Sequence, residues 1–236
     1  MRKIILGIIL LAAQTAMAAT ESEPECVIMI HGMMRTQAAM VKLSSALQAQ
    51  GYFVVNESYP TNRYTIQQVA QSYVPHYVDQ CLEKKASKIH FVTHSIGGLV
   101  LRAYLSEHTL PTGSRVVMLA PPNHGSTLAD TLHKSKIFNM MTGPMGQQLQ
   151  TKGFVEELPE TFPVDIGVIT GSSSLNPIAA TMLGGENDGK VSVGSAKLAG
   201  MKDFMVVPVS HTFIMRSPQV IEATSTFLKL GSFHKT

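Results

Sequence analysis

Three polar residues could together cleave an ester bond by nucleophilic attack: Ser95, Asp188 and His211. Ser95 follows a short apolar run, Ile89–Val92, and precedes a helix-like run that begins at Gly97. A serine in a sharp turn between a strand and a helix presents its hydroxyl at the end of the sheet. His211 would take the serine proton, and Asp188 would orient the imidazole and stabilise its cation. The sequence therefore predicts hydrolysis through an acyl-enzyme.

The elements that must position these residues alternate between strand and helix along the chain. Such alternation predicts an α/β fold, with a mostly parallel sheet of about six strands and helices on both faces. Active-site groups of such sheets gather beyond the carboxyl ends of the strands. The predicted strands are Val27–Ile30, Tyr52–Val55, Ile89–Val92, Val116–Leu119, Ile166–Thr170 and Phe204–Val209, and the predicted helices are Gln37–Gln48, Thr65–Leu82, Gly97–Ser106 and Pro218–Leu230.

Four segments in this order resemble the α/β-hydrolase superfamily: His31-Gly32 after the first strand, Thr93-His94-Ser95-Ile96-Gly97, Asn187-Asp188-Gly189 and Val209-Ser210-His211. The resemblance covers nearly the whole chain after its first segment. It is closest to small secreted bacterial lipases and esterases, including the lipase class 2 and GPI-inositol-deacylase-like groups. Thr93 stands where the family's usual elbow pattern has glycine. The resemblance implies a minimal α/β-hydrolase domain that cleaves carboxylic esters, with lipid acyl esters as the expected substrates.

Two backbone N–H groups should form the oxyanion hole that stabilises the charged intermediate. Ile96 follows the nucleophile at the start of a helix. Met33 follows His31-Gly32 and resembles the position of the second donor in the family. Because both residues would act through their amides, their side chains can vary.

Other histidines compete with His211 for the role of base. His31, His94 and His124 all lie near the expected site, but none of them follows the last strand. We expect His94, at the variable position of the elbow, to point away from the base. We expect the loop that carries His124 to shape the wall of the pocket.

The acid is less sharply defined than the base, because Asn-Asp-Gly is also a common surface turn. Glu186 is the alternative to Asp188. Asp165 and Asp203 each precede a predicted strand and would therefore lie at the opposite end of the sheet.

The amino-terminal residues resemble a secretory signal, which predicts a periplasmic or secreted protein. Arg2 and Lys3 precede an apolar run that is too short to span a bilayer, and Ala16-Met17-Ala18 fits a cleavage site. Cleavage after Ala18 would leave residues 19–236 as a single hydrolase domain. An uncleaved anchor is the alternative.

The chain has two cysteines, Cys26 and Cys81. An even number of cysteines in an exported protein suggests a disulfide, and a bridge across a loop of this length would stabilise the fold by about 4 kcal/mol. Two buried free thiols are the alternative. Neither cysteine lies in a context that suggests catalysis.

One segment, residues 132–163, interrupts the regular alternation between the fourth and fifth strands. It is rich in Met, Phe, Gly and Pro, and the resemblance implies a small cap or lid at this place. Methionine suits a surface that adapts to acyl chains. An ordinary crossover whose methionines fill the core is the alternative.

Composition narrows the remaining function classes. The formal net charge of +3 comes without a basic stripe, which argues against nucleic acid as a partner. No metal-ligand spacing or phosphate-binding loop is present, so we expect no cofactor. We expect a monomer that acts on a small ester or lipid and makes transient contact with a lipid surface. A thioesterase, amidase or polyester hydrolase of the same fold, or a non-catalytic lipid-binding member, remains the alternative.

Overall fold

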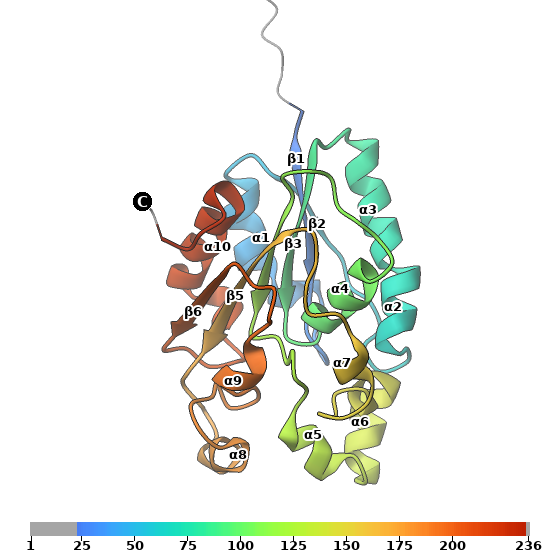
Figure 1. Cartoon of the computed structure of the whole chain (residues 1–236), viewed down its shortest axis with the longest axis vertical. Coiled ribbons are helices and arrows are strands. Elements are labelled where there is room, and N and C mark those ends of the chain that lie inside the picture. Colours follow the sequence, from blue (N-terminus) through green and yellow to red (C-terminus); the bar gives the residue numbers. More distant parts are fainter. Residues whose placement is uncertain (1–22, 235–236) are drawn as a thin grey trace, which may run out of the picture.

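A computed structural model describes residues 23–234, so the predicted signal at residues 1–18 lies outside the described residues. A six-stranded sheet, with all neighbouring strands parallel, runs through the centre in the order β2-β1-β3-β4-β5-β6 (Figure 1). The predicted fold class is confirmed. The strands are β1 (Glu25–Ile30), β2 (Phe53–Asn56), β3 (Lys88–His94), β4 (Arg115–Leu119), β5 (Asp165–Gly171) and β6 (Asp203–Val207).

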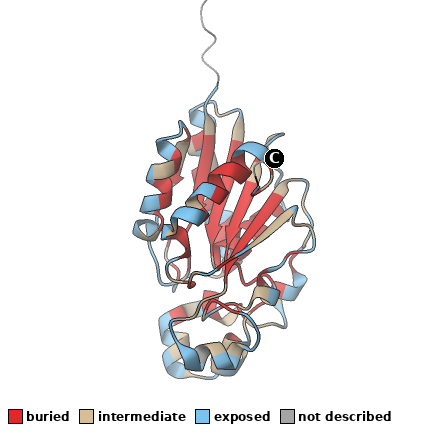
Figure 2. Ribbon diagram, turned by 90° about the vertical axis from the view of Figure 1, so that its left-hand side faces the viewer, coloured by how far each residue is buried: buried red, intermediate tan, exposed pale blue. Residues whose placement is uncertain are grey.

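Helices cover both faces of the sheet, which explains why the central strands are continuous apolar runs. The strands are mostly buried, whereas the helices turn exposed residues outward (Figure 2). The core divides into two clusters, one on each face of the sheet. One face carries α1 (Val41–Gln48), α10 (Pro218–Leu230) and the short 3-10 helix η2 (Ile214–Arg216), and the other carries α2 (Ile66–Ser72), α3 (Val74–Glu83) and α4 (Gly97–Leu105).

Two predicted helices are divided in the structure. The predicted helix Thr65–Leu82 breaks at Tyr73 into α2 and α3, because Pro75 lacks the N–H that would continue the ladder and occupies the first turn of α3 instead. The predicted helix Gln37–Gln48 begins as the 3-10 helix η1 (Gln37–Ala39) and becomes α-helical only at α1.

Five short helices lie at or beyond the carboxyl ends of the strands, in the lower half of Figure 1. The fourth and fifth strands are connected through three of these helices, which overlap the predicted cap segment. The other two, α8 and α9, lie between β5 and β6 and were not expected from the sequence; α8 packs against α5. These helices are α5 (Thr127–Leu132), α6 (Lys136–Gln147), α7 (Phe154–Glu157), α8 (Pro177–Leu183) and α9 (Val193–Ala196).

Helix α6 bends at Gly143, which has φ +62° and precedes Pro144. A side chain at Gly143 would place its Cβ only 2.1 Å from the carbonyl oxygen of Asn62. Glycine therefore allows both the left-handed backbone and the close approach of the loop after β2.

A buried arginine on α4 anchors the base of the lobe formed by helices α5 to α9. The guanidinium of Arg102 donates hydrogen bonds to the carbonyls of Asn123, Leu158 and Pro159 at 2.7–3.1 Å. Burial lowers the pKa of Arg102 to about 10, so the group remains charged at neutral pH. Arg102 thus ties two segments to α4, the helix that follows Ser95: the loop after β4 and the end of the connection between β4 and β5.

A disulfide joins Cys26 in β1 to Cys81 in α3, with the two Cα atoms 5.7 Å apart. Both residues are fully buried. The bridge ties helix α3 to the sheet. No helix within residues 23–234 is long and apolar enough to cross a membrane.

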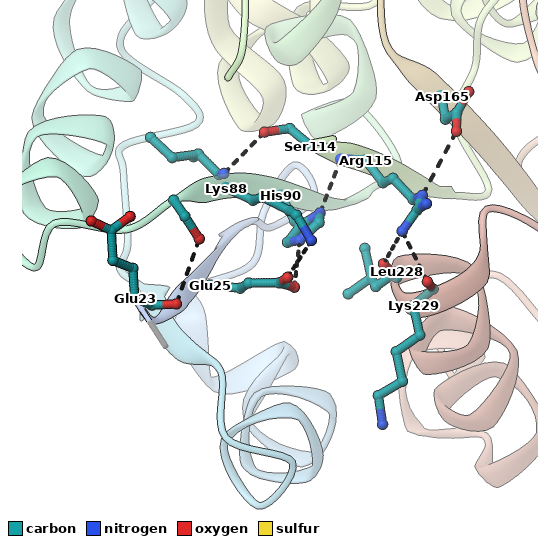
Figure 3. A network of polar contacts seen from close by, with 11 residues as sticks. Glu23, Glu25, Lys88, His90, Ser114, Arg115, Asp165, Leu228 and Lys229 are labelled. Carbon is teal, nitrogen blue, oxygen red and sulfur yellow. Dashed lines mark hydrogen bonds and ion pairs between the residues drawn. The ribbon is translucent and has the colours of Figure 1, made fainter. Parts of the chain in front are cut away.

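The amino ends of the strands carry a polar network of their own (Figure 3). The buried imidazole of His90 accepts a hydrogen bond from the Arg115 N–H at 2.9 Å and donates to Glu25 at 3.1 Å. Asp165 pairs with Lys202 and with Arg115. These groups stabilise the end of the sheet opposite to Ser95.

Candidate active site

Ser95 lies in the sharp turn between β3 and α4, with the left-handed φ of +55° that marks a strained strand-to-helix turn. Its N–H donates to the carbonyl of Leu119 at 2.9 Å, which fixes the turn against β4. A Cβ at Gly97 would approach the carbonyl oxygen of Ile30 to 2.5 Å. The glycine two residues after the serine therefore allows the turn to sit against β1.

The side chains of Ser95, His211 and Asp188 form one hydrogen-bonded chain. The Ser95 hydroxyl lies 3.0 Å from Nε2 of His211, and Nδ1 of His211 lies 2.7 Å from Oδ2 of Asp188. His211 and Asp188 are buried, with 4% and 1% of their surfaces exposed. If Nδ1–H donates to the carboxylate, the lone pair of Nε2 faces the serine hydroxyl, as a general base requires.

The loop that carries Asp188 holds the carboxylate in place. Its other oxygen, Oδ1, accepts hydrogen bonds from the backbone N–H groups of Lys190 and Val191. The carbonyl of Asp188 also accepts a hydrogen bond from the N–H of His211. The alternative acid, Glu186, is exposed and forms no hydrogen bond or ion pair with His211.

The two amides expected in the oxyanion hole belong to Met33, after β1, and to Ile96, at the start of α4. Within residues 23–234 neither N–H has a hydrogen-bond acceptor, so both remain able to bind a ligand oxygen. Met33 and Ser95 line the same cavity.

His31 fixes the peptide that supplies one of these amides. Its Nε2 accepts a hydrogen bond from the N–H of Tyr59, so its Nδ1 carries the proton and donates to the carbonyl of Gly32 at 3.0 Å. In a trans peptide the carbonyl and the following N–H point in opposite directions, so the hydrogen bond to the Gly32 carbonyl also sets the direction of the Met33 N–H. Burial lowers the pKa of His31, which keeps this neutral form.

The expectation that His94 points away from the base is wrong. Its Nε2 donates to the carbonyl of His211 at 3.1 Å, and the centres of the two rings are 4.9 Å apart. A Cβ at Gly32 would lie 2.7 Å from Nδ1 of His94. His94 therefore packs between the loops that carry Met33 and His211. Burial holds its pKa well below the ordinary value, with a smaller contribution from repulsion by His211.

The other residues weighed from the sequence lie apart from the hydrogen-bonded chain. His124 is half exposed, lies 3.6 Å from Glu160 and lines a neighbouring cavity. Asp165 belongs to the ion pairs at the amino end of β5. Asp203 accepts hydrogen bonds from Ser232 and Phe233.

An apolar cavity of about 100 Å³ opens next to Ser95 and His211. Its walls include residues from α5, from α6 and from the segment after it: Leu128, Ala129, Phe138 and Leu149. The lobe beyond the sheet therefore forms one side of the cavity that contains the serine. Met140 and Met141 do not fill the core, because they are 76% and 47% exposed.

A second cavity, of about 190 Å³, adjoins the first. The two share Ser126, Lys190 and Val191, and the residues that line the second include four further serines and threonines. Sequence reasoning missed two cations, Arg35 and Lys190, that line the first cavity. The one sequence feature that pointed to them is their position, since Arg35 lies two residues after Met33 and Lys190 lies two residues after Asp188. No three His, Cys, Asp or Glu side chains among residues 23–234 are placed to hold a metal ion.

A family model described as "Domain of unknown function (DUF7379)" matches residues 11–164, which include β1, the turn at Ser95 and most of the lobe. The chain belongs to this family. No curated protein matches the sequence.

Solved structures with a similar fold include lipases and a phospholipase. The mature lipase BlEst2 of Bacillus licheniformis superimposes with a TM-score of 0.69 at 18% identity, over 89% of this chain and 93% of the lipase. This chain covers 52% of the propeptide form of the same lipase. The phospholipase PlaB of Legionella pneumophila, in complex with thio-NAD, gives 0.67 at 19% identity, over 85% of this chain and 56% of PlaB. A monoacylglycerol lipase of Paleococcus ferrophilus gives 0.57 at 15% identity, over 88% of this chain and 95% of the lipase.

Proposed function

We propose that this DUF7379 protein is a serine hydrolase of carboxylic esters, with Ser95 as nucleophile, His211 as base and Asp188 as the acid that orients it. The observation that carries the proposal is the unbroken chain of hydrogen bonds from Ser95 through His211 to Asp188. The strained turn at Ser95 and the two unpaired amides of Met33 and Ile96 add independent support.

The reaction follows from the roles of these groups. The Ser95 oxygen forms a bond to the acyl carbon as its proton passes to Nε2 of His211. The amides of Met33 and Ile96 donate to the oxygen that becomes negatively charged. His211 then returns the proton to the departing alcohol, and water attacks the acyl-enzyme by the same base catalysis to release the acid.

The substrate class proposed is a lipid acyl ester. Support comes from the apolar cavity beside Ser95 and from the names of the structural neighbours, which are lipases and a phospholipase. The segment 132–163 would act as a cap that contacts lipid. Helix α6 contributes Phe138 to this cavity, and α8 contributes Leu183 to the neighbouring one. Both helices also expose apolar side chains, namely Ile137, Met140, Met141, Ile178 and Met182.

The place of action proposed is the periplasm or the medium. The buried Cys26–Cys81 disulfide supports this, since such bridges persist in oxidising compartments. Removal of residues 1–18 as a signal peptide would leave a single hydrolase domain.

Ester turnover by the Ser95→Ala variant tests the proposal. Without the nucleophile, kcat/KM on p-nitrophenyl butyrate should fall by about 10³-fold or more, because no acyl-enzyme can form. The matched control is Ser106→Ala, which removes an exposed serine at the end of α4 and should keep the parent activity. Near-normal turnover by folded Ser95→Ala would overturn the assignment.

A further inference from the structure

Two positively charged side chains stand at the mouth of the proposed active site. Arg35 follows Met33 by two residues, and Lys190 follows Asp188 by two residues. Both line the apolar cavity that contains Ser95. The loop of the proposed oxyanion hole and the loop of the proposed acid thus each bring a cation to the site.

Neither cation forms an ion pair with an acidic side chain. Among residues 23–234, no carboxylate lies within 4.0 Å of Arg35 or Lys190, and no acidic residue lines either cavity. Asp188 attracts Lys190, but both of its carboxylate oxygens are already hydrogen-bonded, one to His211 and the other to backbone N–H groups.

The two cations act on each other and on the site. Partial desolvation of the Lys190 ammonium, together with repulsion from Arg35, lowers the pKa of Lys190. Both cations also disfavour a charge on the buried His94 beside the serine. A bound anion would offset this repulsion, since opposite charges a few ångströms apart attract strongly in a partly desolvated pocket.

Lys190 stands where the two cavities meet. The first cavity is walled mainly by apolar side chains, and the second has more hydroxyl side chains in its wall, among them Thr127, Thr151, Ser192 and Ser195. Lys190 therefore lies between the chamber that contains Ser95 and a neighbouring chamber with more polar residues in its wall. An ester with an apolar acyl part and a charged alcohol part matches this division.

We propose that the substrate is an acyl ester whose alcohol part carries an anionic group, phosphate or carboxylate, bound by Arg35 and Lys190 while the acyl chain occupies the apolar cavity. This inference rests on the proposed ester hydrolase function. Arg35 and Lys190 would determine specificity and would take no part in the transfer of the acyl group.

The test compares soluble butyryl esters with matched acyl parts: 1-butyrylglycerol, 1-butyrylglycerol 3-phosphate and the butyryl ester of 4-hydroxybutanoate. All three are short enough to stay monomeric, so adsorption to a lipid surface cannot contribute. The quantity measured is the ratio of kcat/KM for each anionic ester to that for the neutral ester. The variants are Arg35→Gln, Lys190→Gln and Lys190→Arg, and the charge-matched control is Lys85→Gln in the turn that follows α3.

We expect the parent protein to prefer an anionic ester, with a ratio that falls about three- to tenfold in Arg35→Gln and in Lys190→Gln. Lys190→Arg should restore most of the ratio, Lys85→Gln should leave it unchanged, and added salt should lower it. A larger effect on the phosphate than on the carboxylate ester would identify a phospholipid-type headgroup, and equal effects would identify a general anion site. A ratio that does not respond to either Gln substitution overturns the inference while the hydrolase function stands.

A different result would show that the proposed hydrolase function is wrong. A parent protein that hydrolyses none of the three esters would overturn the proposed hydrolase function, and this inference with it. Calorimetric titration of Ser95→Ala with 1-butyrylglycerol 3-phosphate supplies a readout that needs no turnover. Binding that Lys190→Gln weakens in this background supports the anion site, and binding that it leaves unaltered contradicts it.

Discussion

The peptide between Gly32 and Met33 connects a buried histidine to the proposed oxyanion hole. His31 donates a hydrogen bond to the Gly32 carbonyl and is held in turn by the N–H of Tyr59, with the two rings stacked 4.2 Å apart. The Tyr59 hydroxyl also donates to the carbonyl of His31. Because a trans peptide is planar, this clamp sets the direction in which the Met33 N–H points.

Removal of that clamp should slow the chemistry more than it weakens substrate binding. We expect His31→Ala to lower kcat on p-nitrophenyl butyrate by about tenfold or more with little change in KM, since the lost contact acts on the developing charge. Steady-state kinetics with Tyr59→Phe as a milder companion variant would check this. An increase in KM alone would indicate a role in binding the substrate.

At this scale the motifs predicted which side chains meet, but not how their neighbours act. Ser95, Asp188 and His211 could be selected because each follows a strand and because serine, acid and base each have a distinctive local pattern. The role of His94 could not be found this way, since its partner is the backbone of a residue 117 positions away. Arg35 and Lys190 carry no motif, and only the fold brings them to one cavity.

Among the elements, α6 is well placed to contact a substrate of the proposed site. Phe138 lines the cavity with Ser95, whereas Met140 and Met141 are exposed on the same helix. Exposed methionines can be changed without a cost to the core, so their effect on activity can be measured separately from stability.

Met140→Ser combined with Met141→Ser should lower kcat/KM on long-chain esters by about tenfold and spare butyrate esters. The reason is that each methionine would bury apolar surface only against a long acyl chain or a lipid surface. A chain-length series of p-nitrophenyl esters measures this, with Leu82→Ser on α3 as the exposed control. Equal losses on short and long esters, together with a lower Tm, would show that these methionines support the core.

The observed helix boundaries agree with the predicted ones where the start and stop signals in the sequence are strong, and they differ elsewhere. Helix α10 has the predicted bounds Pro218–Leu230, because Pro218 begins it and Gly231, with φ +75°, ends it. The division at Tyr73 could have been predicted from Pro75. Helix α8 was missed because its seven residues give no sustained apolar periodicity.

For the molecule as a whole, three buried histidines make stability depend on pH. Burial lowers the pKa values of His31, His90 and His94 below that of an exposed histidine. Below about pH 6.5 the unfolded chain binds protons that the folded chain excludes, so the free energy of unfolding falls as the pH falls.

Denaturant unfolding at pH 7.5, 6.5 and 5.5 measures this dependence. We expect the free energy of unfolding to decrease toward acid, by up to about 1.4 kcal/mol per pH unit for each of the three histidines. His90 should contribute because its Nδ1 accepts the Arg115 N–H (Figure 3), and a proton there would break that bond. A free energy of unfolding that is constant over this range would show that these histidines bind protons in the folded state.

The central claim is that His211 and Asp188 activate Ser95 as a nucleophile, and covalent labelling with a fluorophosphonate tests it most directly. The reagent phosphonylates an activated serine, so intact mass spectrometry should show one adduct on the parent protein, and peptide mapping should locate it at Ser95. Ser95→Ala should take up no label, and His211→Ala should react at least about 10²-fold more slowly, because the serine loses its base. Folded parent protein that takes up no label, or takes it up at another residue, would contradict the account.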